Sequence, residues 1–253
     1  MSDTALQRRA LRETAHRPWP VPAGPWVMAQ TWCDLLFAHW AVEPAELERV
    51  VPKELPLDLW EGRAWIGVTP FDIRSAHPRG LPRVPWLAHF PELNTRTYVT
   101  LGGKPGIYFL SLDAARLPAV TAARRLYRLP YFHAEMDVAR ADGQVSYRST
   151  RRSGDGPPAA FRATYGRGQG ELEGGEALAR WLAERYCLYV KKEGSQVLRG
   201  EIHHPPWPLE PAWADIELNT MAEPFGLDLR GQPLLHFAAR QDTLVWPLRS
   251  AAQ

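Results

Sequence analysis

Apolar and polar positions alternate along much of the chain, which is the pattern of strands that bury one face. The alternation predicts strands over Ala64–Ser75, Glu92–Leu101, Gly106–Asp113, Tyr131–Ala141, Gln144–Arg151, Ala159–Gly166, Cys187–Lys192 and Val197–His204, and a closing pair over Leu234–Ala239 and Thr243–Leu248. Gly102-Gly103-Lys104-Pro105 and Asp142-Gly143 have the composition of hairpin turns. The chain is therefore predicted to be mainly β.

Helical spacing of apolar residues is confined to a few short segments. It predicts helices over Leu117–Arg128 and Glu176–Tyr186, a short one over Pro44–Val51, and a weaker one over Ala212–Met221. Residues 1–25 are polar and then rich in proline, which predicts a flexible or extended arm. With no repeat and no Gly/Ser linker, residues 26–250 are predicted to form a single α+β domain around a large antiparallel sheet.

Composition excludes several classes of protein. Hydrophobic residues make up 45% of the chain and tryptophan occurs 11 times, so a large core can form and disorder is excluded. A net charge of +2 does not favour a nucleic-acid partner, and the apolar stretches are too short to span a membrane. The N-terminus lacks the apolar segment of a signal peptide, so we expect a cytoplasmic protein. Cys33 and Cys187 have no metal-site spacing and are expected to be buried thiols.

One predicted strand carries a row of polar side chains. Because side chains alternate between the two faces of a strand, Glu92, Asn94, Arg96 and Tyr98 share one face. That face is either a solvated outer surface or the wall of a polar cavity inside a curved sheet. In a cavity, arginine would be a natural receptor for a carboxylate. The residues alone leave both interpretations open.

Other polar residues carry weaker signals. His203 and His204 are adjacent on a strand, so one is expected to face the interior and the other solvent, and a shared metal ion is not favoured. His39 lies in an apolar run and is expected to be a hydrogen-bonded core histidine. Asp113 is explained as a capping or turn residue. No nucleophile elbow, P-loop or dinucleotide fingerprint occurs.

Several longer runs together resemble one family. They are WCDLLFAHW (32–40), GRAWIGVTPF (62–71), FPELNTRTYV (90–99), PGIYFLSLD (105–113), LPY (129–131), RYCLY (185–189) and GEIHHPPWPL (200–209). The chain is similar from about Val27 to Leu248 to the YqjF-like bacterial proteins of unassigned function, which are related in fold to acetoacetate decarboxylase. The resemblance implies a strongly curved antiparallel sheet that closes into a cone-like barrel around a central cavity, with peripheral helices. It therefore favours the cavity interpretation of the Glu92 strand.

The resemblance also raises a question about chemistry. The decarboxylases form a Schiff base on a lysine whose pKa is lowered by a second lysine, and the pair follows a helix and a proline. If Pro130 corresponds to that proline, Tyr131 and Phe132 stand where the lysines would be. The four lysines of this chain (Lys53, Lys104, Lys191 and Lys192) fall in or beside predicted turns. We therefore expect no imine chemistry.

These arguments predict a site for a small-molecule ligand, without metal or cofactor. The expected catalytic residues are Glu92, Tyr131 and His203, and the expected ligand-binding residues are Asn94, Arg96, Tyr98 and Ser111. The ligand is expected to be an oxo or carboxylated molecule, and any reaction to be acid–base chemistry of the lyase or hydrolase type. The alternatives are a non-catalytic binding or sensing protein and a structural protein whose cavity is filled by side chains. No nucleic-acid or membrane partner is expected, and a homo-oligomer stays open.

Overall fold

The computed structural model describes residues 5, 9–80, 88–116, 127–191, 194 and 196–251, which form mainly strands. The strands are β1 (Met28–Val42), β2 (Ala64–Pro78), β3 (Phe90–Leu101), β4 (Lys104–Ala114), β5 (Tyr131–Ala141), β6 (Gln144–Arg151), β7 (Ala160–Arg167), β8 (Cys187–Val190), β9 (Leu198–His203), β10 (Glu210–Asn219), β11 (Leu234–Val245) and β12 (Arg249–Ser250). The helical elements within these residues are α2 (Pro44–Leu47), α5 (Gly175–Ala183) and the 3-10 turn η1 (Glu223–Phe225).

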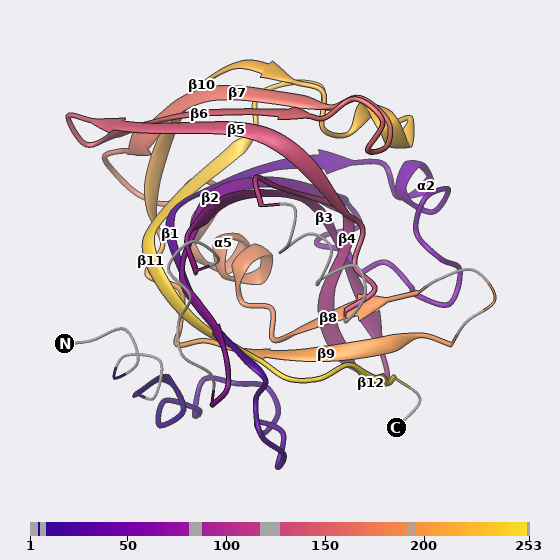
Figure 1. Ribbon diagram of the computed structural model, residues 1–253. Helices are drawn as coiled ribbons and strands as arrows, with labels where there is room; N and C mark the ends of the chain where they lie inside the picture. The colour runs from indigo at the N-terminus through magenta and orange to yellow at the C-terminus, as the bar shows by residue number, and fades with distance from the viewer. Residues whose placement is uncertain are drawn as a thin grey trace.

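The sheet curves until it closes on itself (Figure 1). The strand order is β12-β9-β8-β4-β3-β2-β1-β11-β10-β7-β6-β5, and β9 also pairs with β11, which closes a ring through β8, β4, β3, β2 and β1. The pairing is mostly antiparallel, but β4 runs parallel to both β5 and β8. The predicted barrel of a curved antiparallel sheet is confirmed, and the two parallel pairings of β4 make the sheet a mixed one.

The remaining strands form a second layer outside the ring. Strands β10, β7, β6 and β5 lie over β1, β2 and β3 (Figure 1), and β5 returns to pair with β4. The largest core cluster fills the space between the layers, where Leu36 and Leu93 of the ring pack with Tyr147 and Phe161 of the outer layer. Since Leu93 points outward into this core, the alternation of β3 turns Glu92 into the ring.

Helix α5 covers one end of the ring. It is visible through the ring in Figure 1, and its apolar side chains Leu178 and Leu182 pack on Trp65 of β2 and Tyr98 of β3. Burial of one apolar stripe is the expected behaviour of an amphipathic helix. The helix places the segment that follows it, including Arg185, at the inner surface of the ring.

The N-terminal arm lies against the barrel over residues 9–25, with turns and bends between residues 11 and 19. Arg17 is buried and donates hydrogen bonds to the Ile202 carbonyl at 2.6 Å and to Glu201 at 3.2 Å. The Ala10 carbonyl contacts Nε2 of His203 at 2.7 Å. The sequence predicts a flexible or extended arm, and in the structure buried hydrogen bonds to β9 hold these residues against the barrel.

Three further predictions are corrected or extended. Strand β1 was not predicted, because its second half is buried on both faces and its sequence does not alternate. The segment predicted as a weak helix, Ala212–Met221, is largely strand β10, and its burial alternates with period two. The expected closing pair near the C-terminus is one continuous strand, β11. The helix predicted over Leu117–Arg128 lies almost wholly outside the described residues.

Two other expectations concern membrane-spanning segments and the two cysteines. Within the described residues, no helix has the length and apolar character needed to cross a membrane. Cys33 and Cys187 are free and buried, as expected.

Candidate functional site

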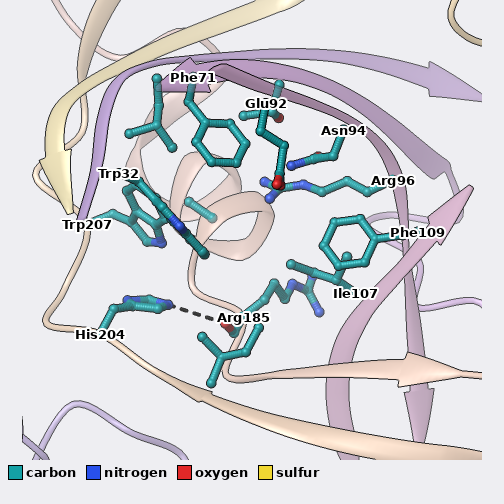
Figure 2. A pocket seen from close by; sticks show the side chains of 14 residues that line it. Trp32, Phe71, Glu92, Asn94, Arg96, Ile107, Phe109, Arg185, His204 and Trp207 are labelled. Carbon is teal, nitrogen blue, oxygen red and sulfur yellow. Dashed lines mark hydrogen bonds between the residues drawn. The ribbon is translucent and has the colours of Figure 1, made fainter. Parts of the chain in front are cut away.

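A small cavity lies inside the ring, and the polar row of β3 forms one of its walls (Figure 2). The volume open to the centre of a water molecule is about 40 Å³, which is room for about three waters. The cavity is lined by Trp32, Leu35, Thr69, Phe71, Glu92, Asn94, Arg96, Ile107, Phe109, Ala183, Arg185, Ile202, His204 and Trp207. The cavity interpretation of the β3 row therefore holds for Glu92, Asn94 and Arg96, which the fold brings together.

The cavity has unlike walls. Strand β3 supplies polar groups, whereas Trp32 and Trp207 stack on the opposite side (Figure 2), with their ring centres 6.0 Å apart. The ring centre of Phe71 lies 5.6 Å from that of Trp32. Apolar walls with a few convergent polar groups are typical of small-molecule sites. The arrangement suits a ligand with a polar end and a small apolar remainder.

Glu92 is the acidic residue among those that line the cavity. Its carboxyl group is buried, points into the cavity (Figure 2), and accepts a hydrogen bond on Oε2 from the Tyr131 hydroxyl at 2.8 Å. Burial raises the pKa of Glu92 to about 8; the Tyr131 hydrogen bond opposes this rise and the charge of Asp113 adds to it. Burial also raises the pKa of Tyr131 well above its ordinary value. At neutral pH both members of the pair keep their protons.

Arg96 faces the cavity without a carboxylate partner among the described residues. Its guanidinium lies 5.2 Å from the ring centre of Phe37 and 5.8 Å from that of Tyr98. Both Nε and Nη2 are buried and have no hydrogen-bond partner in the described part of the chain, and the same holds for Oδ1 of Asn94. Buried polar groups are almost always paired, so these unpaired atoms set this wall of the cavity apart.

Arg185 is a cavity residue that the sequence analysis missed. It follows α5 in the chain and contacts the carboxylate of Asp58 through Nη1. The signal for it lay in the run RYCLY, which begins with this arginine between the predicted helix and strand.

Tyr98 and Ser111 do not line the cavity. The Tyr98 hydroxyl is hydrogen bonded to Nε2 of His39 at 2.6 Å, which confirms His39 as a hydrogen-bonded core histidine. Ser111 pairs with Thr95, whereas the next pair on β3 and β4 joins Arg96 to Phe109. This bulge turns Ser111 to the face of Thr95, away from the cavity, because residues directly opposite one another share a face.

His203 is the last residue of β9 and His204 follows it, and the two side chains point in different directions. His204 lines the cavity, with its ring nitrogens 2.7 Å from the Pro205 carbonyl and 3.3 Å from the Arg185 carbonyl. His203 faces the N-terminal arm, outside the cavity, where its Nε2 contacts the Ala10 carbonyl. The expectation that one of the two would face solvent is wrong, because the arm covers His203. Burial lowers the pKa of each to about 4.

The lysines and possible metal ligands lie elsewhere. Nζ of Lys104 is 3.9 Å from Oε1 of Glu201, and Nζ of Lys191 is 3.0 Å from Oε1 of Glu54. Lys53 is exposed in a loop. None of these three lines the cavity, and Lys192 lies outside the described residues. Among the residues that the structure describes, no group of three or more His, Cys, Asp or Glu side chains is arranged to hold a metal ion.

Known structures with the same fold include acetoacetate decarboxylases. The decarboxylase of Legionella pneumophila matches with a TM-score of 0.60 and 12% identity, covering 95% of this chain and 94% of that one. The enduracididine biosynthesis enzyme MppR, in complex with pyruvate, matches with a TM-score of 0.62 and 11% identity over 94% of this chain and 93% of its own. An acetoacetate decarboxylase-like enzyme of Sphingomonas wittichii has a TM-score of 0.60 at 14% identity, covering 93% and 97%.

Sequence comparison gives a nearer relationship. The model of the DUF2071 family, described as an uncharacterized conserved protein, matches residues 29–242. The uncharacterized protein YqjF of Bacillus subtilis is 45% identical over 231 residues, which cover 90% of this chain and 94% of that protein. The chain therefore belongs to the DUF2071 family, as a YqjF-like protein with the fold of acetoacetate decarboxylase.

Proposed function

We propose that the protein binds a small oxo-carboxylate in the barrel cavity, with the carboxylate on Arg96, and that Glu92 exchanges a proton with the bound molecule. The observation that carries the proposal is the buried guanidinium of Arg96, whose Nε and Nη2 have no partner among the described residues. Guanidinium and carboxylate groups pair in a planar, two-bonded geometry, so an arginine at a cavity wall selects such a ligand.

The charge of the cavity supports a ligand with one negative charge. Asp58 balances Arg185, and burial keeps Glu92 and His204 uncharged near neutral pH. Arg96 then leaves the cavity with one unbalanced positive charge. An unpaired charge in a buried site is costly, and a bound monoanion would remove that cost.

Two proteins of the same fold are associated with small oxo-carboxylates. MppR is described in complex with pyruvate, and the decarboxylases are named for acetoacetate. The small volume of the present cavity accords with molecules of this size. The fold alone does not assign a function, so the argument for this chain rests on Arg96 and Glu92.

Glu92 supplies the proposed chemistry. A carboxyl group that stays protonated at neutral pH can donate a hydrogen bond or a proton to a bound molecule. Tyr131 donates to Oε2 of Glu92 and so leaves the proton on the other carboxyl oxygen. In a reaction of the lyase type, such a donor stabilises negative charge that develops on the ligand as a bond breaks. Conversion of a bound acid, followed by NMR, would distinguish an enzyme from a binding protein.

The Arg96→Gln variant is expected to lose binding of pyruvate and acetoacetate. Hydrogen bonds to charged groups contribute about 1.5–3 kcal/mol each, so the affinity should fall at least about tenfold. Isothermal titration calorimetry measures the change. Arg63→Gln, which removes an exposed arginine paired with Glu43, is the matched control and should bind as the wild type does. Equal affinities of Arg96→Gln and the wild type would contradict the assignment.

Borohydride treatment in the presence of acetoacetate is expected to leave the protein unmodified. An imine needs an amine at the bound ligand, and the described lysines lie outside the cavity lining. Mass spectrometry of the intact protein and of its peptides reads the result directly. A reduced adduct on Lys191, Lys192 or any other lysine would require a covalent mechanism in place of the one proposed.

A further inference from the structure

Arg185 is held in a fixed orientation by the protein itself. Its Nε donates to the Trp181 carbonyl at 2.8 Å, and its Nη1 donates to the carboxylate of Asp58. The guanidinium also lies on the rings of Trp181 and Tyr98, with its central carbon 4.3 and 4.7 Å from the ring centres. A group so fixed loses little freedom when it binds a ligand.

One nitrogen of this arginine has no protein partner. Nη2 of Arg185 is buried and makes no hydrogen bond within the described residues, although the side chain lines the cavity. Figure 2 shows Arg185 on the wall across from Glu92. Since Nε and Nη1 each donate to a protein acceptor, Nη2 is the guanidinium nitrogen left for a ligand oxygen.

Arg185 and Arg96 differ in charge balance. Arg185 has Asp58 as its counter-ion, whereas Arg96 has no carboxylate partner among the described residues. Both guanidinium groups lie against the ring of Tyr98. Burial lowers the pKa of Arg185, and the nearby charge of Arg96 lowers it further. Arg96 therefore supplies an unbalanced positive charge for a carboxylate, whereas Arg185, whose charge Asp58 balances, supplies a hydrogen-bond donor for an uncharged oxygen.

We propose that Arg185 determines specificity by donating from Nη2 to an uncharged oxo oxygen of the ligand. The cavity would then prefer an oxo-monocarboxylate to a plain monocarboxylate, which leaves Nη2 unpaired, and to a dicarboxylate, whose second charge has no free counter-charge. This inference rests on the proposed function, because it assumes that the carboxylate occupies Arg96.

The test compares pyruvate, propionate and malonate by calorimetric titration. These probes are an oxo-monocarboxylate, its analogue without the oxo oxygen, and a dicarboxylate. The wild type should bind pyruvate at least about tenfold more tightly than propionate. Arg185→Gln should weaken the binding of both acids, because it leaves the charge of Asp58 unbalanced, but pyruvate should lose more affinity than propionate and the preference should disappear. Arg180→Gln, an exposed arginine on α5, is the control and should keep the preference.

A second variant covers the case in which Arg185→Gln does not fold. Asp58→Asn keeps a hydrogen-bond acceptor but frees the charge of Arg185, so malonate should gain affinity relative to pyruvate. Three results would each overturn the inference and leave the proposed function standing. They are equal binding of pyruvate and propionate by the wild type, an unchanged preference in Arg185→Gln, and an unchanged affinity for malonate relative to pyruvate in Asp58→Asn. Failure of the wild type to bind any of the three acids overturns the proposed function and the inference together.

Discussion

Replacing Glu92 with glutamine is expected to stabilise the protein, and the gain should grow as the pH rises. Burial raises the pKa of Glu92 from 4.5 to about 8, so between these values the folded protein holds a proton that the unfolded chain releases. The free energy of unfolding is therefore not reduced by Glu92 below about pH 4.5. It falls as the pH rises from there to about 8, because the unfolded chain gives up the proton that the folded protein keeps. Glutamine cannot ionise, and its carbonyl can still accept from the Tyr131 hydroxyl.

The expected gain is on the order of 4 kcal/mol at pH 9 and close to zero near pH 4.5, from the size of the pKa shift. Urea unfolding of the wild type and Glu92→Gln between pH 4 and 9 measures it. Glu135→Gln, at an exposed glutamate, is the control, and its difference from the wild type should not change in this way. A Glu92→Gln variant that is less stable at pH 8, or a difference that is flat with pH, would contradict the buried neutral carboxyl.

A stabilising substitution at Glu92 also bears on function. Residues that cost stability in the folded state are often kept for activity. If Glu92 is the proton donor that we propose, Glu92→Gln should keep the affinity for pyruvate and lose any turnover. The two measurements together separate a role in chemistry from a role in packing.

Replacing Arg151 with methionine is expected to cost about 3–5 kcal/mol, because it leaves one partner of a buried ion pair alone. Arg151 on β6 donates to both carboxylate oxygens of Asp113 on β4, at 2.8 and 3.1 Å, and the two side chains are 1% and 0% exposed. The guanidinium also donates to the Pro157 carbonyl at 2.9 Å. The pair links the outer layer to the ring, and it replaces the capping or turn role that the sequence suggested for Asp113.

Chemical denaturation measures the loss, and two variants control for it. The double variant Arg151→Met with Asp113→Leu removes both charges and should recover most of the stability, since a buried ion pair can often be replaced by apolar groups. Arg152→Met breaks the exposed pair with Glu135, whose side chains are 52% and 69% exposed, and should cost less than about 1 kcal/mol. If Arg151→Met cost no more than Arg152→Met, the buried pair would not be the link between the layers.

The polar wall of the cavity could be predicted from sequence because it depends on one strand. The pleat of β3 fixes that Glu92, Asn94 and Arg96 share a face, whatever the strand packs against. The paired strands β5 and β6, joined by Asp142-Gly143, were predicted with the bounds that the structure has. Periodicity and turn chemistry are local properties, so the sequence carries them in full.

Strand β1 and the arm show where local pattern fails. Much of β1 is buried on both faces, by the cavity side and by the outer layer, so its sequence has no alternation to detect. The arm is polar and rich in proline, which by composition predicts an open chain. It is ordered over residues 9–25 because Arg17 and the Ala10 carbonyl find partners on β9, nearly two hundred residues away.

The sequence by itself thus determined that a polar row faces one side of a strand in a mainly β domain. Only the tertiary structure decided that this side is a cavity, because the ring closes through β9 and β11. It also decided which residues join the row. A bulge in β4 turns Ser111 away and the arm covers His203, whereas the segment after α5 brings in Arg185 and the residue that follows β9, His204, lies on the wall. These outcomes depend on pairings between distant segments, which no local spacing encodes.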